Sequence, residues 1–151
     1  MGDQGQGHPT VYLFVHAIWT VCRQEPLLSK PVRKILFAHM QKEGEEKGIK
    51  ILALNGVDDH IHCLLKLMPS QNLLQVIKSI KTSSAHWLND NRLLSVAFDW
   101  EEGYAAYSVS PSGVQQVMGY IGKQEEYHQS KSLNNELEAI SKFDQYEKAT
   151  V

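Results

Sequence analysis

The sequence predicts an α+β fold in which two helices cover one face of a four-stranded antiparallel sheet. Three observations lead to this prediction: short segments rich in branched and aromatic residues, amphipathic segments with apolar residues at helical spacing, and the order in which they alternate. That order is β-α-β-β-α-β with an appended helical region, which is the arrangement of ferredoxin-like domains. We expect the second face of such a sheet to be uncovered and to favour a dimer.

The first strand and the first helix have clear boundaries in the sequence. Residues 11–20 (VYLFVHAIWT) are branched and aromatic, which is typical of a buried strand. Ser29 is a suitable helix cap, Pro31 fits the first turn, and Gly48 is a suitable end. The apolar stripe of this helix is predicted to be Val32, Ile35, Leu36, His39 and Met40.

The remaining elements follow from the same two periodicities. We predict strands at 49–57, 60–68 and 104–109, and helices at 73–88, 111–129 and from 133 onward. The stripe of the second helix is Leu73, Leu74, Ile77, Ile80, Ser84 and Trp87 with Leu88. The stripe of the last helix is Leu133, Leu137, Ile140 and Phe143.

Length and composition predict one domain at residues 11–148 after a disordered tail at residues 1–10. No apolar run is long enough to span a membrane and the N-terminus does not resemble a signal peptide, so we expect a cytoplasmic protein without a membrane partner. The net charge of −2 argues against a protein that coats nucleic acid by bulk electrostatics. However, residues 101–151 carry four lysines and eight acidic residues, so the acidic excess lies in the last third.

Two histidines, His60 and His62, begin the predicted third strand. Because strand side chains alternate, both imidazoles should lie on one face while Cys63 points to the other. Two neutral imidazoles on one strand could form much of a divalent-metal site. The alternative is a pair of packing or surface histidines, since a chain with seven histidines also produces this spacing by chance.

Tyr120 and Gln124 are four residues apart on the predicted third helix, so the phenol and the amide should point the same way. The alternative is an amphipathic tyrosine at the edge of a core helix. Combined with the histidine pair, Gln124 would complete an N,N,O site that suits Mg²⁺ or Mn²⁺ better than structural zinc. A tyrosine beside such a metal could attack a phosphodiester and form a phosphotyrosine.

Four segments, in this order, resemble the HUH single-tyrosine transposases of the smallest bacterial insertion sequences, the insertion-sequence-200-like group. The segments are 56–65 (GVDDHIHCLL), 77–84 (IKSIKTSS), 100–110 (WEEGYAAYSVS) and 117–128 (VMGYIGKQEEYH). The resemblance extends from about residue 12 to about residue 147, which is nearly the whole chain.

This resemblance implies that His60, His62 and Gln124 hold the divalent metal and that Tyr120 is the nucleophile. It also implies cleavage and rejoining of single-stranded DNA at hairpin-bearing element ends, through a 5′-phosphotyrosine and a free 3′-hydroxyl. The resemblance further implies an obligate homodimer, in which the tyrosine helix of one subunit commonly meets the histidine pair of the other. The chain departs from the family pattern at Tyr127, where relatives often have histidine.

Four further residues are candidates for DNA contacts. Lys78 and Lys81 lie three apart on the second helix with Ser84 one turn on, and Lys123 follows the tyrosine on the third helix. For the lysines the alternative is a solvated helix face. Asp59 could orient an imidazole, although a turn-forming role is the more common one. The histidines without paired spacing are predicted to be structural: His16, His39, His86 and His128.

Two other functions are compatible with these residues. One is a domesticated relative that binds DNA or RNA hairpins without cutting them, although the retained tyrosine, glutamine and histidines count against it. The other is a metal-dependent phosphohydrolase that uses the histidine pair and water without a covalent intermediate. The two are distinguished from a transposase by whether substitution of Tyr120 changes the reaction.

Overall fold

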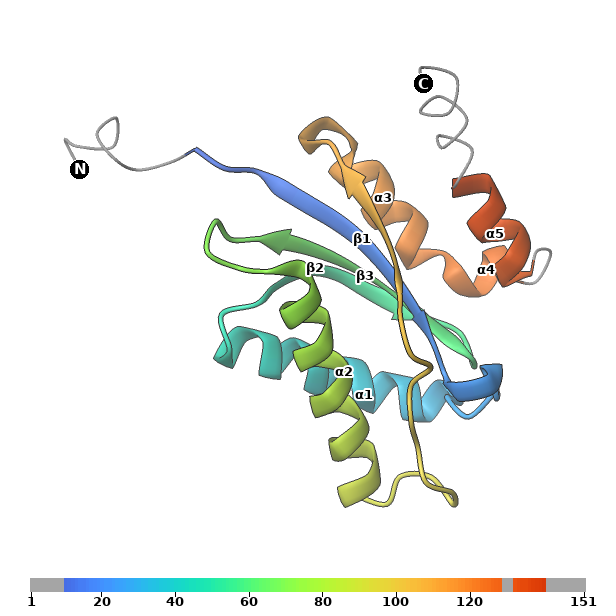
Figure 1. The fold of residues 1–151 in the computed structure, drawn as a ribbon. Coiled ribbons are helices and arrows are strands. Elements are labelled where there is room, and N and C mark those ends of the chain that lie inside the picture. The colour runs from blue at the N-terminus through green and yellow to red at the C-terminus, as the bar shows by residue number, and fades with distance from the viewer. Residues whose placement is uncertain (1–9, 129–131, 141–151) are drawn as a thin grey trace.

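Four strands form one antiparallel sheet in the order β2-β3-β1-β4 in the computed structural model, which describes residues 10–128 and 132–140. The elements are β1 (Leu13–Thr20), α1 (Lys30–Glu46), β2 (Lys50–Gly56), β3 (His60–Leu67), α2 (Leu73–Asp90), β4 (Ala105–Val109), α3 (Val114–Gly122), α4 (Gln124–His128) and α5 (Leu133–Ile140). Their order and pairing confirm the predicted ferredoxin-like α+β fold (Figure 1). Among the described residues, no helix is both long and apolar enough to cross a bilayer.

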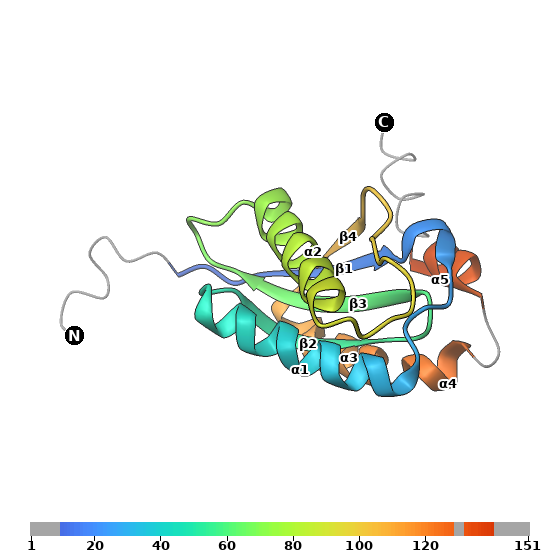
Figure 2. The same cartoon turned by 90° about the horizontal axis from the view of Figure 1, so that it is seen from below.

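Helices α1 and α2 cover one face of the sheet, and the main core lies between these two layers (Figure 2). In the register of β1 with β3, Trp19 is opposite Ile61, and Leu65 lies further along the same face. These three side chains are buried together with Leu36 of α1 and Ile77 of α2. Each such buried side chain contributes about 1.5–3 kcal/mol relative to exposure, so this face holds the two helices firmly.

The opposite face of the sheet is not uncovered, which corrects the prediction from the sequence. Helices α3, α4 and α5 lie on this side in Figure 1, and α3 packs across β2 and β3. As a result Ile18 of β1, on this face, is only 2% exposed. Tyr12, just before β1, stays exposed, and the Lys66 Nζ lies 5.2 Å from the centre of its ring. The sequence did not reveal this cover because it depends on where the appended helices fold back.

The predicted continuous helix over 111–129 is divided into a 3-10 turn, α3 and α4. The break is at Lys123, which has φ −106° and ψ 23°. Asn55 of β2 explains it, because its Nδ2 donates to the carbonyl oxygens of Ile121 at 3.0 Å and Gly122 at 3.2 Å. In an uninterrupted helix those carbonyls would accept from the next turn. The contact therefore ends α3 and attaches it to the sheet.

Two positions of the predicted apolar stripes are exposed, and a charged residue is buried instead. Ile35 is 49% exposed and Leu74 is 54% exposed, whereas Arg33 of α1 is only 6% exposed. The Arg33 guanidinium donates to Asp58 at 2.8 Å and to Glu125 at 2.9 Å. A buried cation is tolerated when carboxylates surround it. Arg33 thus connects α1 to the β2–β3 turn and to α4.

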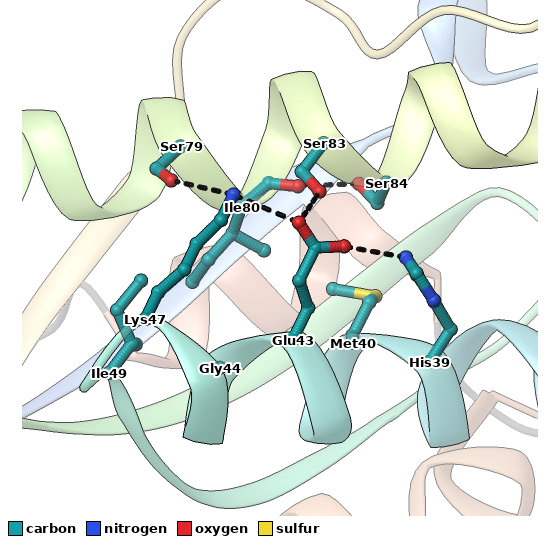
Figure 3. A pocket seen from close by; sticks show the side chains of 10 residues that line it. All are labelled: His39, Met40, Glu43, Gly44, Lys47, Ile49, Ser79, Ile80, Ser83 and Ser84. Atoms are coloured by element: carbon teal, nitrogen blue, oxygen red, sulfur yellow. Dashed lines mark hydrogen bonds and ion pairs between the residues drawn. The ribbon is translucent and has the colours of Figure 1, made fainter.

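A polar cluster between α1 and α2 joins these helices to each other (Figure 3). Glu43 accepts hydrogen bonds from the Ser83 hydroxyl and, at 2.9 Å, from the Lys47 ammonium group. His39 stacks on Trp87 with 4.2 Å between the ring centres. The cavity here has a volume of only about 10 Å³. That volume has room for about one water molecule, so the cluster is a contact between helices and no binding site.

Candidate functional site

Strand β3 places both of its leading histidines on the face that α3, α4 and α5 cover. In the register with β1, His62 is opposite Ile18 and His60 is opposite Thr20, so both rings point to the same side. Both histidines are buried. Gly56 is required just before the turn, because a Cβ there would collide with the backbone of His60 and of its neighbour Ile61. The tight hairpin therefore fixes the position at which the histidine pair begins.

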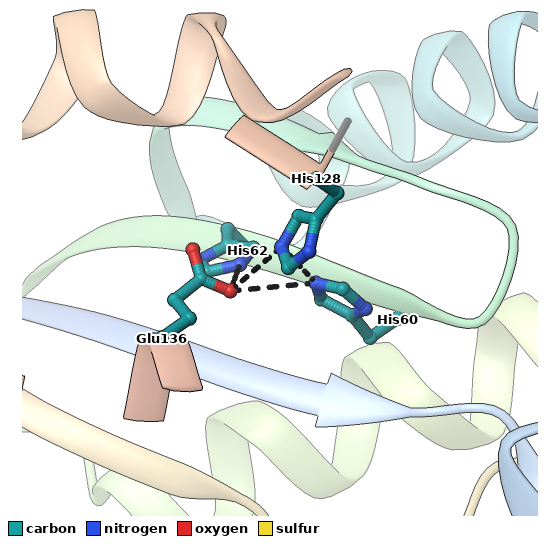
Figure 4. Close-up of side chains that lie close together, drawn as sticks. All are labelled: His60, His62, His128 and Glu136. Carbon is teal, nitrogen blue, oxygen red and sulfur yellow. Dashed lines mark hydrogen bonds and ion pairs between the residues drawn. The ribbon is translucent and has the colours of Figure 1, made fainter. Parts of the chain in front are cut away.

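Two residues from the appended helices meet this pair, His128 of α4 and Glu136 of α5 (Figure 4). Glu136 Oε1 lies 3.1 Å from His62 Nε2, 2.9 Å from His128 Nε2 and 3.6 Å from His60 Nε2. One ligand atom from each of the four residues lies within 4.8 Å of the others. We call His60, His62, His128 and Glu136 the His–Glu cluster.

Each histidine of β3 has a different partner on its other ring nitrogen. Asp59 Oδ1 lies 2.7 Å from His60 Nδ1, and His16 Nε2 lies 2.8 Å from His62 Nδ1. Burial disfavours the charged form of His60, but hydrogen bonds to Asp59 and Glu136 outweigh it and raise the pKa of His60. At His62 burial prevails and lowers the pKa. Burial, together with His62, lowers the pKa of His16 to about 4, so His16 is neutral at pH 7.

Tyr120 and Gln124 meet the same cluster, although the helix breaks between them. The Tyr120 hydroxyl donates to Glu136 Oε2, and Gln124 Nε2 donates to the same oxygen at 2.9 Å. The Tyr120 ring lies edge-on to His62, with 5.9 Å between the ring centres. One chain therefore brings the tyrosine, the glutamine and the histidine pair together.

The donor set of the His–Glu cluster fits a divalent metal ion. Three imidazole nitrogens and a carboxylate oxygen converge in a buried space, and His60 Nε2 is only 3.1 Å from His128 Nε2. Two lone pairs cannot face each other at this distance without a shared proton or a cation. In addition, Gln124 Oε1 is buried without a hydrogen-bond partner among the described residues. An unsatisfied oxygen beside such a cluster is available as a further ligand.

We predict that His16 controls how well His62 can bind a metal. For His62 Nε2 to offer a lone pair, its Nδ1–H must donate to His16 Nε2. His16→Phe keeps a ring but removes the acceptor, and we expect it to weaken metal affinity about 10- to 100-fold. His16→Gln is the matched control, because its amide oxygen can accept the same bond. Calorimetric titration of the DNA-free protein with Mn²⁺ measures both, and unchanged affinity of His16→Phe would contradict the prediction.

A groove of about 500 Å³ opens beside the cluster. His60 and His128 lie along it, as do Asp58 and Glu125 with their partner Arg33. The groove therefore reaches the edge of the cluster at His60 and His128. Because Arg33 pairs with both carboxylates, their charge is partly neutralised.

The four residues predicted to contact DNA are not close together. Lys123 is exposed at the break between α3 and α4, next to Gln124. Lys78 and Lys81 are on α2, on the other side of the sheet, and Lys81 Nζ donates to the carbonyl oxygens of Glu101 at 2.7 Å and Gly103 at 2.8 Å. Ser84 is buried, and its hydroxyl is engaged within the protein: it donates to the Ile80 carbonyl and accepts from the Trp100 indole.

Sequence reasoning missed three residues of the site: His16, His128 and Glu136. A signal existed for His128, which follows Tyr120 and Gln124 at a further spacing of four. It was predicted to be only structural, and the structure places it in the His–Glu cluster. His16 is on the same face of β1 as Ile18, so strand alternation could have placed it near the pair. For Glu136 no local pattern indicates the site.

Comparison with known proteins identifies the family of this chain. A model of the family described as "Transposase IS200 like" matches residues 10–124, which contain His60, His62, Tyr120 and Gln124. The ISDra2 transposase TnpA of Deinococcus radiodurans is 26% identical over 134 residues, covering 81% of this chain and 91% of that protein.

The fold is also similar to that of two solved structures. One is a protein from Deinococcus radiodurans R1 assigned as a transposase, with a TM-score of 0.62 and 22% identity over 78% of this chain and 94% of that chain. The other is a REP-associated tyrosine transposase bound to a REP hairpin, with a TM-score of 0.60 and 13% identity over 82% of this chain and 74% of that chain. Since the family match spans most of the sequence, the chain belongs to the IS200-like transposases, a family of DNA-processing enzymes.

Proposed function

We propose that this protein cleaves and rejoins single-stranded DNA at the hairpin-bearing ends of an insertion sequence, through a covalent 5′-phosphotyrosine at Tyr120. One observation carries the proposal: the Tyr120 hydroxyl contacts the same buried carboxylate, Glu136, that contacts His62 and His128. A nucleophile and a metal site that share one partner are close enough to act on the same phosphodiester.

In the proposed reaction the Tyr120 oxygen attacks phosphorus, and the bond from phosphorus to the 3′-oxygen breaks. The phosphotyrosine retains the energy of the broken phosphodiester, so a second 3′-hydroxyl can reverse the step without ATP. His60, His62 and Gln124 would hold the metal, with His128 and Glu136 as further donors, and the bound metal would supply positive charge next to the phosphoryl oxygens.

The residues around the histidines prepare the site before DNA arrives. Asp59 fixes the ring of His60 and His16 fixes the ring of His62, each through one hydrogen bond. The groove that reaches His60 and His128 is the proposed path of the single strand. Because the net charge is −2, we expect DNA to be held by local contacts, with Lys123 nearest the nucleophile and Lys78 and Lys81 as more distant candidates.

The hairpin substrate is supported by the solved REP-associated transposase, which is bound to a hairpin. The experiment is to incubate single-stranded DNA carrying a hairpin and a flanking strand with the protein and Mn²⁺, and to separate the products on a denaturing gel. We expect a covalent protein–DNA adduct and a fragment with a free 3′-hydroxyl. Salt-sensitive hairpin binding without an adduct would instead indicate a domesticated binding protein. Cleavage without an adduct that persists in Tyr120→Phe would indicate a phosphohydrolase.

We expect the protein to prefer Mn²⁺ to Mg²⁺. Three imidazoles and one carboxylate form the His–Glu cluster. Mg²⁺ favours oxygen ligands and retains its water, whereas Mn²⁺ binds more tightly to nitrogen-containing sites. At equal low metal concentration, adduct formation should be faster with Mn²⁺, and removal of metal by a chelator should stop it. Equal rates with both metals across a full titration would contradict the preference.

We also propose a homodimer. Its support is the resemblance to dimeric relatives, together with the exposed Tyr12 and Leu13 near the start of β1 and the free edge of β4 in the described sheet. Light scattering at micromolar concentration should give the mass of two chains of 17.1 kDa each. The mass of a single chain would rule out a stable dimer.

A further inference from the structure

One carboxylate contacts both the nucleophile and the histidines. Glu136 Oε2 accepts hydrogen bonds from the Tyr120 hydroxyl and, at 2.9 Å, from Gln124 Nε2. Its other oxygen, Oε1, faces His62 and His128 at 3.1 and 2.9 Å. The Glu136 side chain is 0% exposed, so these contacts are made away from bulk water.

The local sequence explains why Glu136 points into the cluster. Ser132 precedes α5, its hydroxyl accepts from Asn135 N at 3.2 Å, and its carbonyl accepts from Glu136 N at 3.0 Å. These bonds fix where the helix begins. Leu133 is buried at the same end, which anchors the first turn. Glu136 is therefore held one turn into α5, outside the range 10–124 that the family model matches.

We propose that Glu136 is a catalytic residue, the base that takes the proton of Tyr120 when the phenol oxygen attacks phosphorus; this inference rests on the proposed function. The O–H bond of the phenol breaks and its proton passes to Glu136 Oε2. The phenol oxygen forms a bond to phosphorus, and the bond to the 3′-oxygen breaks. The electron pair leaves with the 3′-oxygen, which takes a proton from solvent water. In rejoining, the incoming 3′-hydroxyl gives up its proton to water, and Glu136 returns its own proton to the departing phenolate.

A base is needed because a phenol with an ordinary pKa near 10 is almost entirely protonated at pH 7. Proton transfer to a positioned side chain typically contributes about 10²- to 10⁴-fold to a rate. Glu136 is the side chain that accepts the hydrogen bond of this phenol. Both nitrogens of the nearby His62 are already engaged, one by His16 and one by Glu136. Geometry thus favours the carboxylate over the imidazole as the proton acceptor.

The test compares Glu136→Gln with Glu138→Gln, an exposed glutamate two positions along the same helix. With saturating Mn²⁺ and hairpin DNA, single-turnover adduct formation by Glu136→Gln should be about 10²- to 10⁴-fold slower. Glu138→Gln should match the wild type. The adduct rate of Glu136→Gln should also rise about tenfold per pH unit above pH 7, because the phenolate must then form unaided. A wild-type rate, or an unchanged pH profile, would overturn the proposal.

Metal affinity must be measured separately, because Glu136 also belongs to the His–Glu cluster. Titration of the DNA-free variants with Mn²⁺ provides this value, and a rate defect that disappears at higher Mn²⁺ would overturn the role as a base. If Glu136→Gln does not fold, the second variant is Glu136→Asp, which keeps the carboxylate. A fluorinated tyrosine at position 120, whose phenol is more acidic, should then increase the adduct rate of Glu136→Asp more than that of the wild type. Equal acceleration would overturn the proposal. If the wild type forms no adduct, the proposed function itself fails.

Discussion

Tyr120→Phe is expected to reduce the covalent protein–DNA adduct to below detection while leaving the fold and hairpin binding intact. The substitution removes the oxygen that would attack phosphorus and keeps the ring that lies against His62. The lost hydrogen bond to Glu136 should change stability by only about 1–3 kcal/mol. The measurement is a denaturing gel of protein incubated with hairpin DNA and Mn²⁺.

Tyr127→Phe is the matched control for this substitution. Tyr127 is on α4, and its ring centre is 5.4 Å from that of Tyr120, so it samples the same surroundings. We expect Tyr127→Phe to form the adduct at about the wild-type rate. If adduct formation survives in Tyr120→Phe and is lost in Tyr127→Phe, the nucleophile is Tyr127 and the assignment to Tyr120 is wrong.

His62→Ala is expected to have the largest effect on metal binding. His62 is buried and connects His16 to Glu136. Its loss removes one metal ligand and leaves both of these residues without one of their hydrogen-bond partners. We expect Mn²⁺ affinity to fall by at least about 100-fold, and adduct formation to fall with it. This effect is larger than that of removing a residue that only hydrogen-bonds to a metal ligand. Calorimetry without DNA measures the first effect and the gel assay the second.

The exposed His86 of α2 provides the control for this experiment. His86→Ala should bind Mn²⁺ and cleave DNA like the wild type. Truncation of a buried side chain can also destabilise the protein by several kcal/mol. Thermal melting curves of both variants are therefore measured together with the titrations. A folded His62→Ala protein that binds Mn²⁺ with wild-type affinity would remove His62 from the proposed site.

Most of the sheet could be predicted because local periodicity determines it. Alternation along β1 and β3 separates Trp19 and Ile61 from Ile18 and His62, so the side occupied by the histidine pair follows from the spacing alone. Helical spacing likewise located α1 and α2, since a buried stripe must recur every three or four residues. Ile35 did not follow its stripe, because the buried face of α1 runs instead through Arg33, Leu36 and Met40.

The cover over the histidines could not be predicted because it depends on contacts between distant segments. Asn55 ends α3 by bonding to its last carbonyls, and no sequence pattern links Asn55 to these two residues. Glu136 reaches His62 from 74 positions away in the chain, with no pattern that links them. The sequence therefore predicted the tyrosine, the glutamine and the histidine pair as candidates, and only the folded chain placed a carboxylate between them.

The most direct test of the central claim is to identify the residue that carries the DNA. The adduct formed with hairpin DNA and Mn²⁺ is digested with nuclease and protease, and the modified peptide is sequenced by tandem mass spectrometry. We predict a peptide in which a nucleotide is joined through its 5′-phosphate to Tyr120. A nucleotide on Tyr127 or on any other residue, or cleaved DNA with no modified peptide, would contradict the proposed mechanism.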